Sequence, residues 1–424
     1  MRIVNLTPFE LLARPQQPAP PDWALTVVLK GTFTLKPDAP CPPAAKHKPI
    51  QGDETFLDEI GRSLRWADDG APIKPHTDFY ILGSFHQPGG VPAPFGRASF
   101  ELGPLSKELL FFGPRFATPG RQWEIGPPAP VASVPLRWEF SFGGLSDPRN
   151  PLGRGIEPAT LPDGSEALAL PQIEYPEQRL RKLGDRPPPA NFAPVPPGFE
   201  SRLAKRGTYD QRWAVFRAPL PPLDFDPSYY NAAPGDQQAG NFPRGDETLI
   251  LRNLHPSLPE LRTRLPGVSP HAGVLVAEGM SASPQPVTMN LDTIVAMPEE
   301  DALVLVWRGV VPLRGGALSE EILWLQVELE ETSAEKPPFA PLAARMLNGW
   351  QPAAAAPAAA PAAPPAEDED VAKSLGEARK LLAGVALPPA LAQLVAEEND
   401  PNILFDALGK HIEETLSSLE SQLG

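Results

Sequence analysis

Cysteine is nearly absent from this chain of 424 residues, in which Cys41 is the only one. A single cysteine can form neither an intramolecular disulfide nor a cysteine zinc cluster, which is typical of proteins from a reducing compartment. The first residues lack the apolar region and cleavage site of a signal peptide, and no apolar run approaches the roughly 18 residues of a membrane span. These absences favour a cytoplasmic protein with no membrane insertion.

Positive charge is also scarce, because 37 lysines and arginines face 52 acidic residues, for a net charge of −15. Phosphate binding needs a cationic surplus, so the balance argues against a nucleic-acid partner. The charge is uneven. Residues 351–424 hold 12 acids and 4 bases, a net charge of −8, which leaves −7 for the first 350 residues.

Patterns that carry catalysis or metal binding are missing too. None of the 6 histidines stands at a metal-binding spacing, and no nucleophile elbow, phosphate loop or dinucleotide fingerprint occurs. Cys41 lies between two prolines without an activating pattern. We therefore predict no catalytic residue, no metal site and no cofactor.

Proline, in contrast, is abundant, with 59 residues. Proline is excluded from helix interiors and central strands, so the chain must consist of short elements joined by rigid turns. Residues 23–36 alternate between apolar and polar side chains. This period of two predicts a strand with one buried face and one wet face, and the wet face would carry Thr26, Lys30 and Thr32.

Similar runs continue to residue 330, whereas long helical patterns are nearly absent before residue 341. We predict a mainly β fold, a sandwich-like or partly barrelled scaffold with long Pro/Gly-rich loops, plus a small C-terminal α-helical tail. Residues 298–301 suit a hairpin turn. The further predicted strands are 79–84, 98–102, 108–112, 134–140, 212–217, 248–251, 273–277, 287–296, 302–311 and 321–330.

Composition divides the chain into a β-rich domain at 1–340, an Ala/Pro-rich and acidic linker at 341–370 and a helical tail at 371–424. Apolar residues recur at helical spacing in the tail, which predicts an amphipathic helix. Such a stripe is usually intramolecular core, but behind a proline-rich spacer it also suits docking to a partner. The candidate partner-binding residues are Leu404, Leu408, Ile412, Leu416 and Leu419.

Acidic residues crowd residues 52–84 around Trp66, namely Asp53, Glu54, Asp58, Glu59, Asp68, Asp69 and Asp78. A glycosidase needs two carboxylates that flank a bond, often beside an aromatic platform. Closeness in sequence does not supply that geometry, and turn-forming or solvated acids are the simpler interpretation. A carbohydrate-active hydrolase or lectin-like module stays open as the alternative, and burial of Trp66 and Trp138 would count against it.

Arg65 and Arg137 each precede a tryptophan, and Arg308 follows one. Buried Arg–carboxylate pairs that hold loops down would explain this pattern. The conceivable partners are Asp78, Asp210 and Asp292.

Several ordered blocks resemble the domain-of-unknown-function family 2169. They include Gly52-Asp53 with the SLRW and KP-x-TD residues of 63–78, the PLRWE and FGG residues of 135–144, the GTYD residues of 207–210, and LDT with WRG near residues 291–309. The resemblance covers roughly residues 1–330. Its signature residues, expected to determine the fold, are Asp53, Arg65, Trp66, Lys74, Asp78, Arg137, Trp138, Tyr209, Asp210, Asp292, Trp307 and Arg308.

The resemblance implies a cytoplasmic, non-enzymatic adaptor or chaperone of bacterial type VI secretion. Its partners would be a secreted effector protein and the spike or spike-tip protein. The family offers no established catalytic residue to carry over. A structural component of the secretion apparatus is a second alternative.

Overall fold

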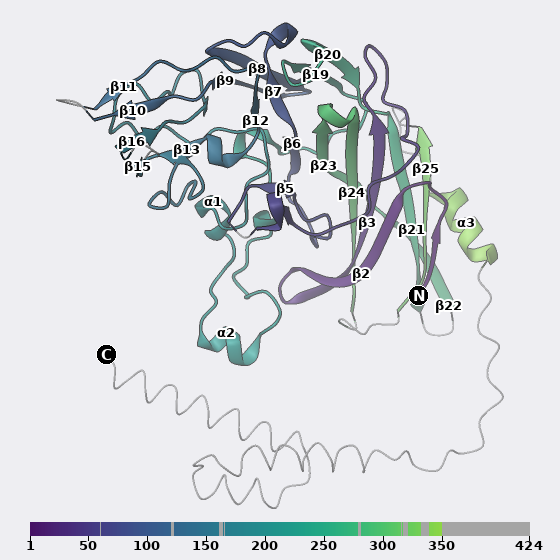
Figure 1. Ribbon diagram of the computed structural model, residues 1–424. Coiled ribbons are helices and arrows are strands. Elements are labelled where there is room, and N and C mark those ends of the chain that lie inside the picture. The colour runs from purple at the N-terminus through teal and green to yellow at the C-terminus, as the bar shows by residue number, and fades with distance from the viewer. Residues whose placement is uncertain are drawn as a thin grey trace, which may run out of the picture. The chain divides into compact units, whose positions relative to one another are not determined.

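The computed structural model describes residues 1–349 except 60, 120–122, 161–163, 165, 279–280, 315, 317–320 and 332–338 (Figure 1). The chain divides into two compact units, Met1–Trp350 and Gln351–Gly424. The predicted partner-binding residues of the tail, Leu404, Leu408, Ile412, Leu416 and Leu419, lie outside the described residues.

A six-stranded sheet forms the centre of the first unit, in the order β18-β6-β23-β24-β3-β2. Strands β6 and β23 run parallel, and the other neighbours are antiparallel. The hairpin predicted at residues 298–301 is confirmed, since a 3₁₀ turn joins β23 to β24 there. The strands are β2 (Glu10–Ala19), β3 (Asp22–Thr34), β6 (Thr77–Ile81), β18 (Gln238–Ala239), β23 (Asn290–Met297) and β24 (Ala302–Pro312).

One face of this sheet packs on two further sheets through a shared apolar core. The five-stranded sheet has the order β17-β9-β8-β19-β20, and the four-stranded sheet has the order β1-β25-β21-β22. Their strands are β8 (Phe95–Leu102), β9 (Leu105–Phe112), β17 (Ile173–Glu174), β19 (Thr248–Arg252) and β20 (Glu260–Arg264), then β1 (Arg2–Asn5), β21 (Val268–Glu278), β22 (Ser281–Val287) and β25 (Ile322–Glu331). The mainly β prediction is confirmed, and the sheets of the described residues remain open rather than closing into a barrel.

The other face of the six-stranded sheet is buried, so the prediction that it faces water is wrong. Thr26 and Lys30 are 0% exposed and Thr32 is 4% exposed. A second apolar core covers this face, with Leu64 and Trp66 from one covering segment and residues 232–233 from another. Alternation in sequence predicts the two faces of a strand, but it cannot show that a second layer buries the polar one.

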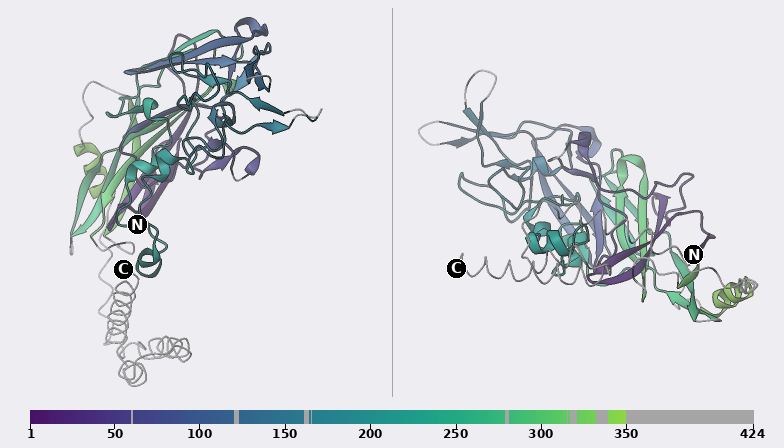
Figure 2. Two further views of the ribbon diagram at one scale, coloured as in Figure 1. Left: turned by 90° about the vertical axis from the view of Figure 1, so that its left-hand side faces the viewer. Right: turned by 90° about the horizontal axis from the view of Figure 1, so that it is seen from below.

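Short elements complete the first unit. A second four-stranded sheet, β11-β10-β16-β15, extends from one side of the body, and three two-stranded ribbons pair β12 with β7, β13 with β14 and β4 with β5 (Figure 2). These strands are β4 (Glu54–Thr55), β5 (Leu64–Trp66), β7 (Ser84–His86), β10 (Phe116–Thr118), β11 (Glu124–Ile125), β12 (Ser133–Pro135), β13 (Phe142–Gly143), β14 (Arg154–Gly155), β15 (Ala159–Thr160) and β16 (Glu166–Ala169). The helices are α1 (Glu200–Leu203), α2 (Gln211–Phe216) and α3 (Ala340–Gly349), and the 3₁₀ turns are η1 (Phe56–Asp58), η2 (Pro88–Gly90), η3 (Trp138–Phe140), η4 (Pro227–Tyr230), η5 (Gly235–Gln237) and η6 (Pro298–Glu300).

Four of the predicted strands are wrong in whole or in part, and two of them, 79–84 and 287–296, each run across a break between two strands. Residues 212–217 form helix α2, because the Asp210 side chain accepts a hydrogen bond from the Trp213 N–H and so caps a helix at this point. Residues 134–140 begin in β12 but then turn into η3.

Helix α3 crosses the boundary predicted at residue 340. Its Leu342 and Met346 side chains are fully buried against Leu275 and Trp324 of the four-stranded sheet. The first compact unit therefore extends to Trp350, and the predicted linker does not begin at residue 341.

Candidate functional site

A chain of buried polar contacts, the polar network, lies on the covered face of the six-stranded sheet. Arg308 on β24 donates from Nε to Asp292 Oδ2 on β23 at 2.6 Å. Its Nη1 donates to the backbone oxygens of Asp69 and Ala71 in the covering segment. This buried pair holds the segment on the sheet, and Asp292 is one of the three conceivable partners named for the arginines beside tryptophan.

The network continues to Lys30 and Trp66. Lys30 Nζ lies 2.6 Å from Asp69 Oδ2, and the same oxygen accepts the Trp66 Nε1–H at 3.0 Å. Lys30 also stacks on the Trp66 ring at 4.1 Å. Burial lowers the pKa of the Lys30 ammonium and raises the pKa of the Asp69 carboxyl, because desolvation disfavours both charged forms while their mutual attraction opposes it.

The network ends at Asp78 on β6. Lys74 Nζ joins Asp78 Oδ2 at 2.9 Å and Thr293 Oγ1 at 2.8 Å, and Thr293 in turn donates to Asp292. Asp78 also accepts hydrogen bonds from Asn231 Nδ2 and from the backbone amides of residues 232 and 233. The carboxylate thus fastens two covering segments to the same strand.

The other signature residues fall into different places. Trp307 packs with Phe9 and Phe33 in the main core. Trp138 is buried against Phe199 and donates its Nε1–H to Pro194 O at 2.7 Å. Asp53 is exposed, and its carboxylate accepts the Asp68 amide.

Two predicted Arg–carboxylate pairs do not form. Arg137 lies with its guanidinium carbon 4.0 Å above the Phe56 ring, and Arg65 is exposed with no carboxylate partner among the described residues. Asp210 caps α2, and Asp78 pairs with Lys74 instead.

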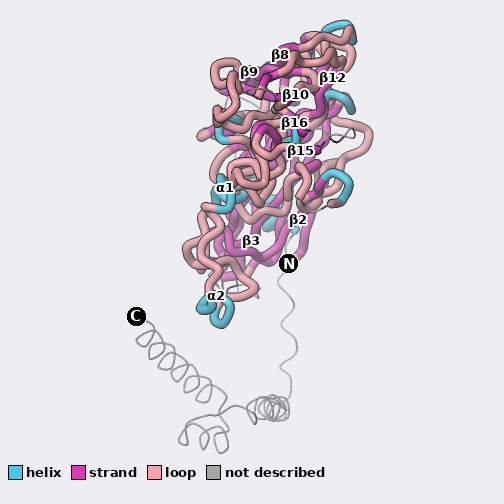
Figure 3. Tube along the Cα trace, turned by 60° about the vertical axis from the view of Figure 1, so that its left-hand side comes forward, coloured by secondary structure: helices cyan, strands magenta, loops and turns pink. Residues whose placement is uncertain are grey.

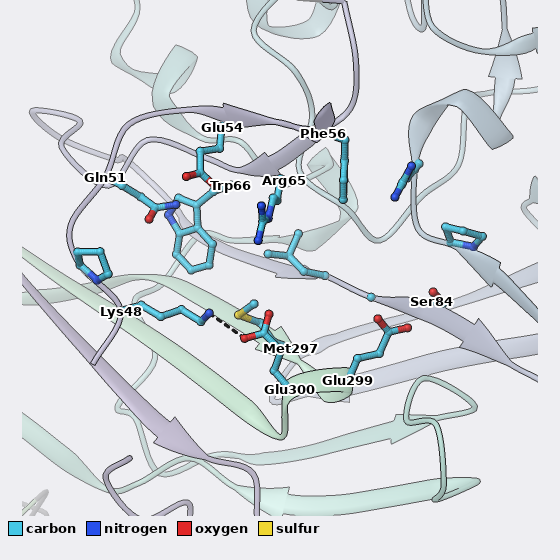
Figure 4. A pocket seen from close by; sticks show the side chains of 15 residues that line it. Lys48, Gln51, Glu54, Phe56, Arg65, Trp66, Ser84, Met297, Glu299 and Glu300 are labelled. Atoms are coloured by element: carbon cyan, nitrogen blue, oxygen red, sulfur yellow. Dashed lines mark hydrogen bonds and ion pairs between the residues drawn. The ribbon is translucent and has the colours of Figure 1, made fainter. Parts of the chain in front are cut away.

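A pocket of about 360 Å³ lies where the parallel strands β6 and β23 end. Leu82 and Gly83 follow β6, whereas Met297 and Glu299 lie at the end of β23. The ribbon β4–β5 and Arg137 complete the walls (Figure 4). Signature residues Arg65, Trp66 and Arg137 therefore meet at one cavity. The lining consists of Lys48, Pro49, Gln51, Glu54, Phe56, Arg65, Trp66, Leu82, Gly83, Ser84, Pro135, Arg137, Met297, Glu299 and Glu300.

One side chain holds two of these walls together. Glu139, two residues after Arg137, accepts hydrogen bonds from the Ser63 backbone amide and hydroxyl. The Ser63 hydroxyl oxygen in turn accepts the Trp138 amide at 2.7 Å. These bonds fix the backbone beside Arg65 and Arg137, so the pocket is a pre-formed feature of the fold.

The acidic residues of 52–84 do not form a paired site. Asp69 and Asp78 are engaged separately in the polar network, Asp53 binds a backbone amide, and the side chain of Asp58 lies outside the described part. Trp66 is 3% exposed and Trp138 is 4% exposed, so neither offers a platform for a sugar ring. This geometry counts against the carbohydrate alternative. Within the described ranges, no group of three or more His, Cys, Asp or Glu residues is placed to hold a metal ion.

Lys107 on β9 is a further buried cation outside the polar network. Its ammonium donates to Asn191 O, Asp236 Oδ1 and Gln237 Oε1, each at 2.8 Å. Burial lowers the pKa of Lys107 to about 8, although the attraction of Asp236 opposes this shift.

Residues 204–226, called the arm below, project from the body between α1 and η4, with α2 at the tip (Figure 3). Polar bonds fix the shape of the arm. Asp224 accepts the backbone amide and hydroxyl of Thr208 at 3.0 and 2.7 Å, which joins the two limbs. The Asp226 amide donates to Lys205 O at 2.9 Å and closes the base.

Large apolar side chains on the arm face solvent. Val215 is 54% exposed, Phe216 52% and Leu223 67%, and the signature residue Tyr209 is 45% exposed. Exposed apolar side chains that gather on one segment are a feature of interaction sites. One signal for the arm was overlooked in the strand prediction, namely Asp210 three residues before Trp213, which is a helix-cap spacing. The pocket had no such signal, because its walls come from segments far apart in the chain.

Among the described residues, no helix combines the length and apolar character needed to cross a membrane. Neither curated proteins nor solved structures give a match to the chain. The model of a family described as an uncharacterized protein conserved in bacteria, DUF2169, matches residues 22–308, which is more than half of the chain. This range includes the polar network, the pocket and the arm. The chain therefore belongs to the DUF2169 family of uncharacterized bacterial proteins.

Proposed function

We propose that this protein is a non-enzymatic, cytoplasmic adaptor or chaperone that binds a type VI secretion effector and helps to load it onto the spike or spike-tip protein. The observation that carries the proposal is the arm. Asp210 and Asp224 bond within the arm and Arg217 joins it to Gln17 on β2, while Val215, Phe216 and Leu223 have no cover among the described residues. A rigid segment that exposes apolar side chains supports a role in protein binding.

The charge around the arm indicates the kind of partner surface that would fit. The arm contains four cations and three acids, a net charge of +1 in a chain of net charge −15. Arg206 and Arg212 are exposed beside the apolar side chains. The arm therefore suits an effector surface that is apolar at its centre and acidic at its rim.

An adaptor needs a second contact, for which we propose the amphipathic stripe of the tail. A tether raises the local concentration of the second contact and so adds avidity without new contacts elsewhere. The spike or spike-tip protein is the partner proposed for this contact. Deleting residues 351–424 tests this part separately, and unchanged binding of both effector and spike would exclude the tail.

The arm is tested by affinity purification of the tagged chain from its native bacterium, followed by identification of the secreted toxin that co-purifies. We expect Val215→Asp with Phe216→Asp to reduce recovery of that toxin by about tenfold or more, because charges would occupy an apolar interface. Leu145→Asp is the matched control, since Leu145 is 87% exposed outside the arm.

If the arm variant recovers as much toxin as the wild-type protein, the proposal is contradicted. Retention of this protein in the assembled secretion machine would favour a structural component instead, because an adaptor is released after loading.

A further inference from the structure

The pocket contains two arginines without a carboxylate partner. Among its other charged groups, Lys48 Nζ pairs with Glu300 at 2.8 Å and Glu299 contacts His86 at 3.1 Å, whereas Glu54 has no ion pair with a described residue. Arg65 and Arg137 have no ion pair with any described residue. Two guanidinium groups are thus left free on one cavity.

The guanidinium of Arg137 has a second feature that indicates a missing hydrogen-bond partner. Its Nε is buried and has no hydrogen-bond acceptor among the described residues. A buried donor without an acceptor costs free energy, and a guanidinium fork matches the two oxygens of a carboxylate. Stacking on Phe56 holds this guanidinium at the pocket wall, and Figure 4 shows Phe56 beside Arg65.

The remaining lining indicates the size and charge of the ligand. Three cations and three glutamates line the pocket, so its formal charge is zero, which suits one negative charge better than a phosphate dianion. Leu82, Met297 and Phe56 offer apolar surface next to the arginines. The volume of about 360 Å³ falls within the roughly 300–1,000 Å³ of small-ligand sites.

We propose that this pocket binds a peptide carboxylate, with the carboxylate between Arg65 and Arg137 and a neighbouring apolar side chain against Leu82 and Met297. The inference deepens the proposed adaptor function by adding a contact distinct from the arm. Its test uses synthetic peptides and no effector, so its failure and that of the adaptor proposal are distinguishable.

The probe is the peptide acetyl-Leu-Glu-Leu-amide, whose only charge is the glutamate carboxylate, and the matched control is acetyl-Leu-Gln-Leu-amide. Binding is followed on the full chain through the NMR signal of the ¹³C-labelled Met297 methyl group, which is assigned with Met297→Leu. We expect a saturable shift with the Glu peptide and binding about tenfold weaker with the Gln peptide. Added salt should weaken the first interaction and not the second.

Arg65→Gln should weaken binding of the Glu peptide about tenfold without changing the melting temperature, because Arg65 is exposed and makes no ion pair. Lys48→Gln is the matched variant. Lys48 already pairs with Glu300, so we expect a change of about twofold or less. Arg137→Gln also removes the stacking on Phe56, and Arg65→Gln is therefore the decisive variant.

The proposal is overturned by equal binding of the two peptides, by an unchanged affinity in Arg65→Gln, or by no Met297 shift at millimolar peptide. If inorganic phosphate binds more tightly than the Glu peptide, the proposal of a carboxylate ligand is wrong and the pocket binds a phosphate group instead. Acetyl-Leu-Leu with a free terminus, compared with its amide, distinguishes a chain terminus from an acidic side chain as the source.

Discussion

The polar network and the arm use similar side chains in opposite ways. In the network, Lys74, Asp78 and Arg308 are buried and tie separate segments to one sheet. In the arm, Asp210 and Asp224 bond only to neighbouring groups of the arm and fix its shape, while the apolar side chains face solvent. The signature residues of the network are therefore explained by the stability of the fold. Those of the arm instead support a surface whose apolar side chains contribute little to that stability.

The largest effect is expected from Asp78→Ala in the network. The substitution leaves the Lys74 ammonium and the Asn231 amide without their buried carboxylate partner. We expect the free energy of unfolding to fall by about 3–5 kcal/mol. Urea unfolding followed by circular dichroism measures it, and a loss below about 1 kcal/mol would mean that the network does not hold the covering segments.

A smaller effect on stability, which depends on pH, is expected at Lys107. Lys107 is buried like the cations of the network, but its partner Asp236 is more exposed than their carboxylates. The pKa of Lys107 is lowered from 10.5 to about 8, so the unfolded chain binds more protons between these values. Stability contributed by this group therefore increases as the pH rises from about 8 to about 10.5, by up to about 3 kcal/mol. Lys107→Met should lose this increase, which urea midpoints at pH 8 and pH 10 measure, and parallel pH profiles of the two proteins would contradict the assignment.

Within the arm, Asp210→Ala should cost about 1 kcal/mol, because it removes the cap of α2. The loss should remain local. Hydrogen exchange measured by mass spectrometry should speed up in residues 204–226 and stay unchanged in β3 and β24. Faster exchange in those central strands would show that the arm and the network unfold together.

The smallest effect is expected from Val215→Ser with Phe216→Ser. Both side chains are more than half exposed, so the free energy of unfolding should change by no more than about 0.5 kcal/mol. Thermal unfolding measures this, and binding of a hydrophobic dye should decrease in the same variant. A large destabilisation would assign the two side chains to the fold and remove the contrast with the network.

The sequence predicts those elements whose signal is local. Strand β24 follows from its apolar run, whereas arginine beside tryptophan indicates a buried carboxylate partner without saying that Asp292 is the partner of Arg308. Lys30 was expected to face water, because alternation distinguishes the two faces of a strand but does not show whether either face is covered. The segments that cover Lys30 are distant from it in sequence.

The site is less predictable than the fold. Arg137 was expected to find a carboxylate and instead stacks on Phe56, whose position depends on the contact between Ser63 and Glu139. Residues 212–217 of the arm were predicted as a strand, and the Asp210 cap shows why a helix forms there instead. Cavities between distant segments, such as the one at Arg65, leave no periodic trace in a sequence.

The pairing of β1 with β25 and of β3 with β24 has a consequence for synthesis on the ribosome. Arg2–Asn5 pairs with residues 324–327, and the central strand β3 pairs with β24, some 280 residues later in the chain. At about 5–20 residues per second, β3 waits roughly 14–56 s before its partner is made. Throughout that interval β2 can pair with one edge of this strand of 13 residues, but the other edge lacks its partner. Contacts of such long range also slow folding, so we expect general chaperones to bind the nascent chain before it is complete.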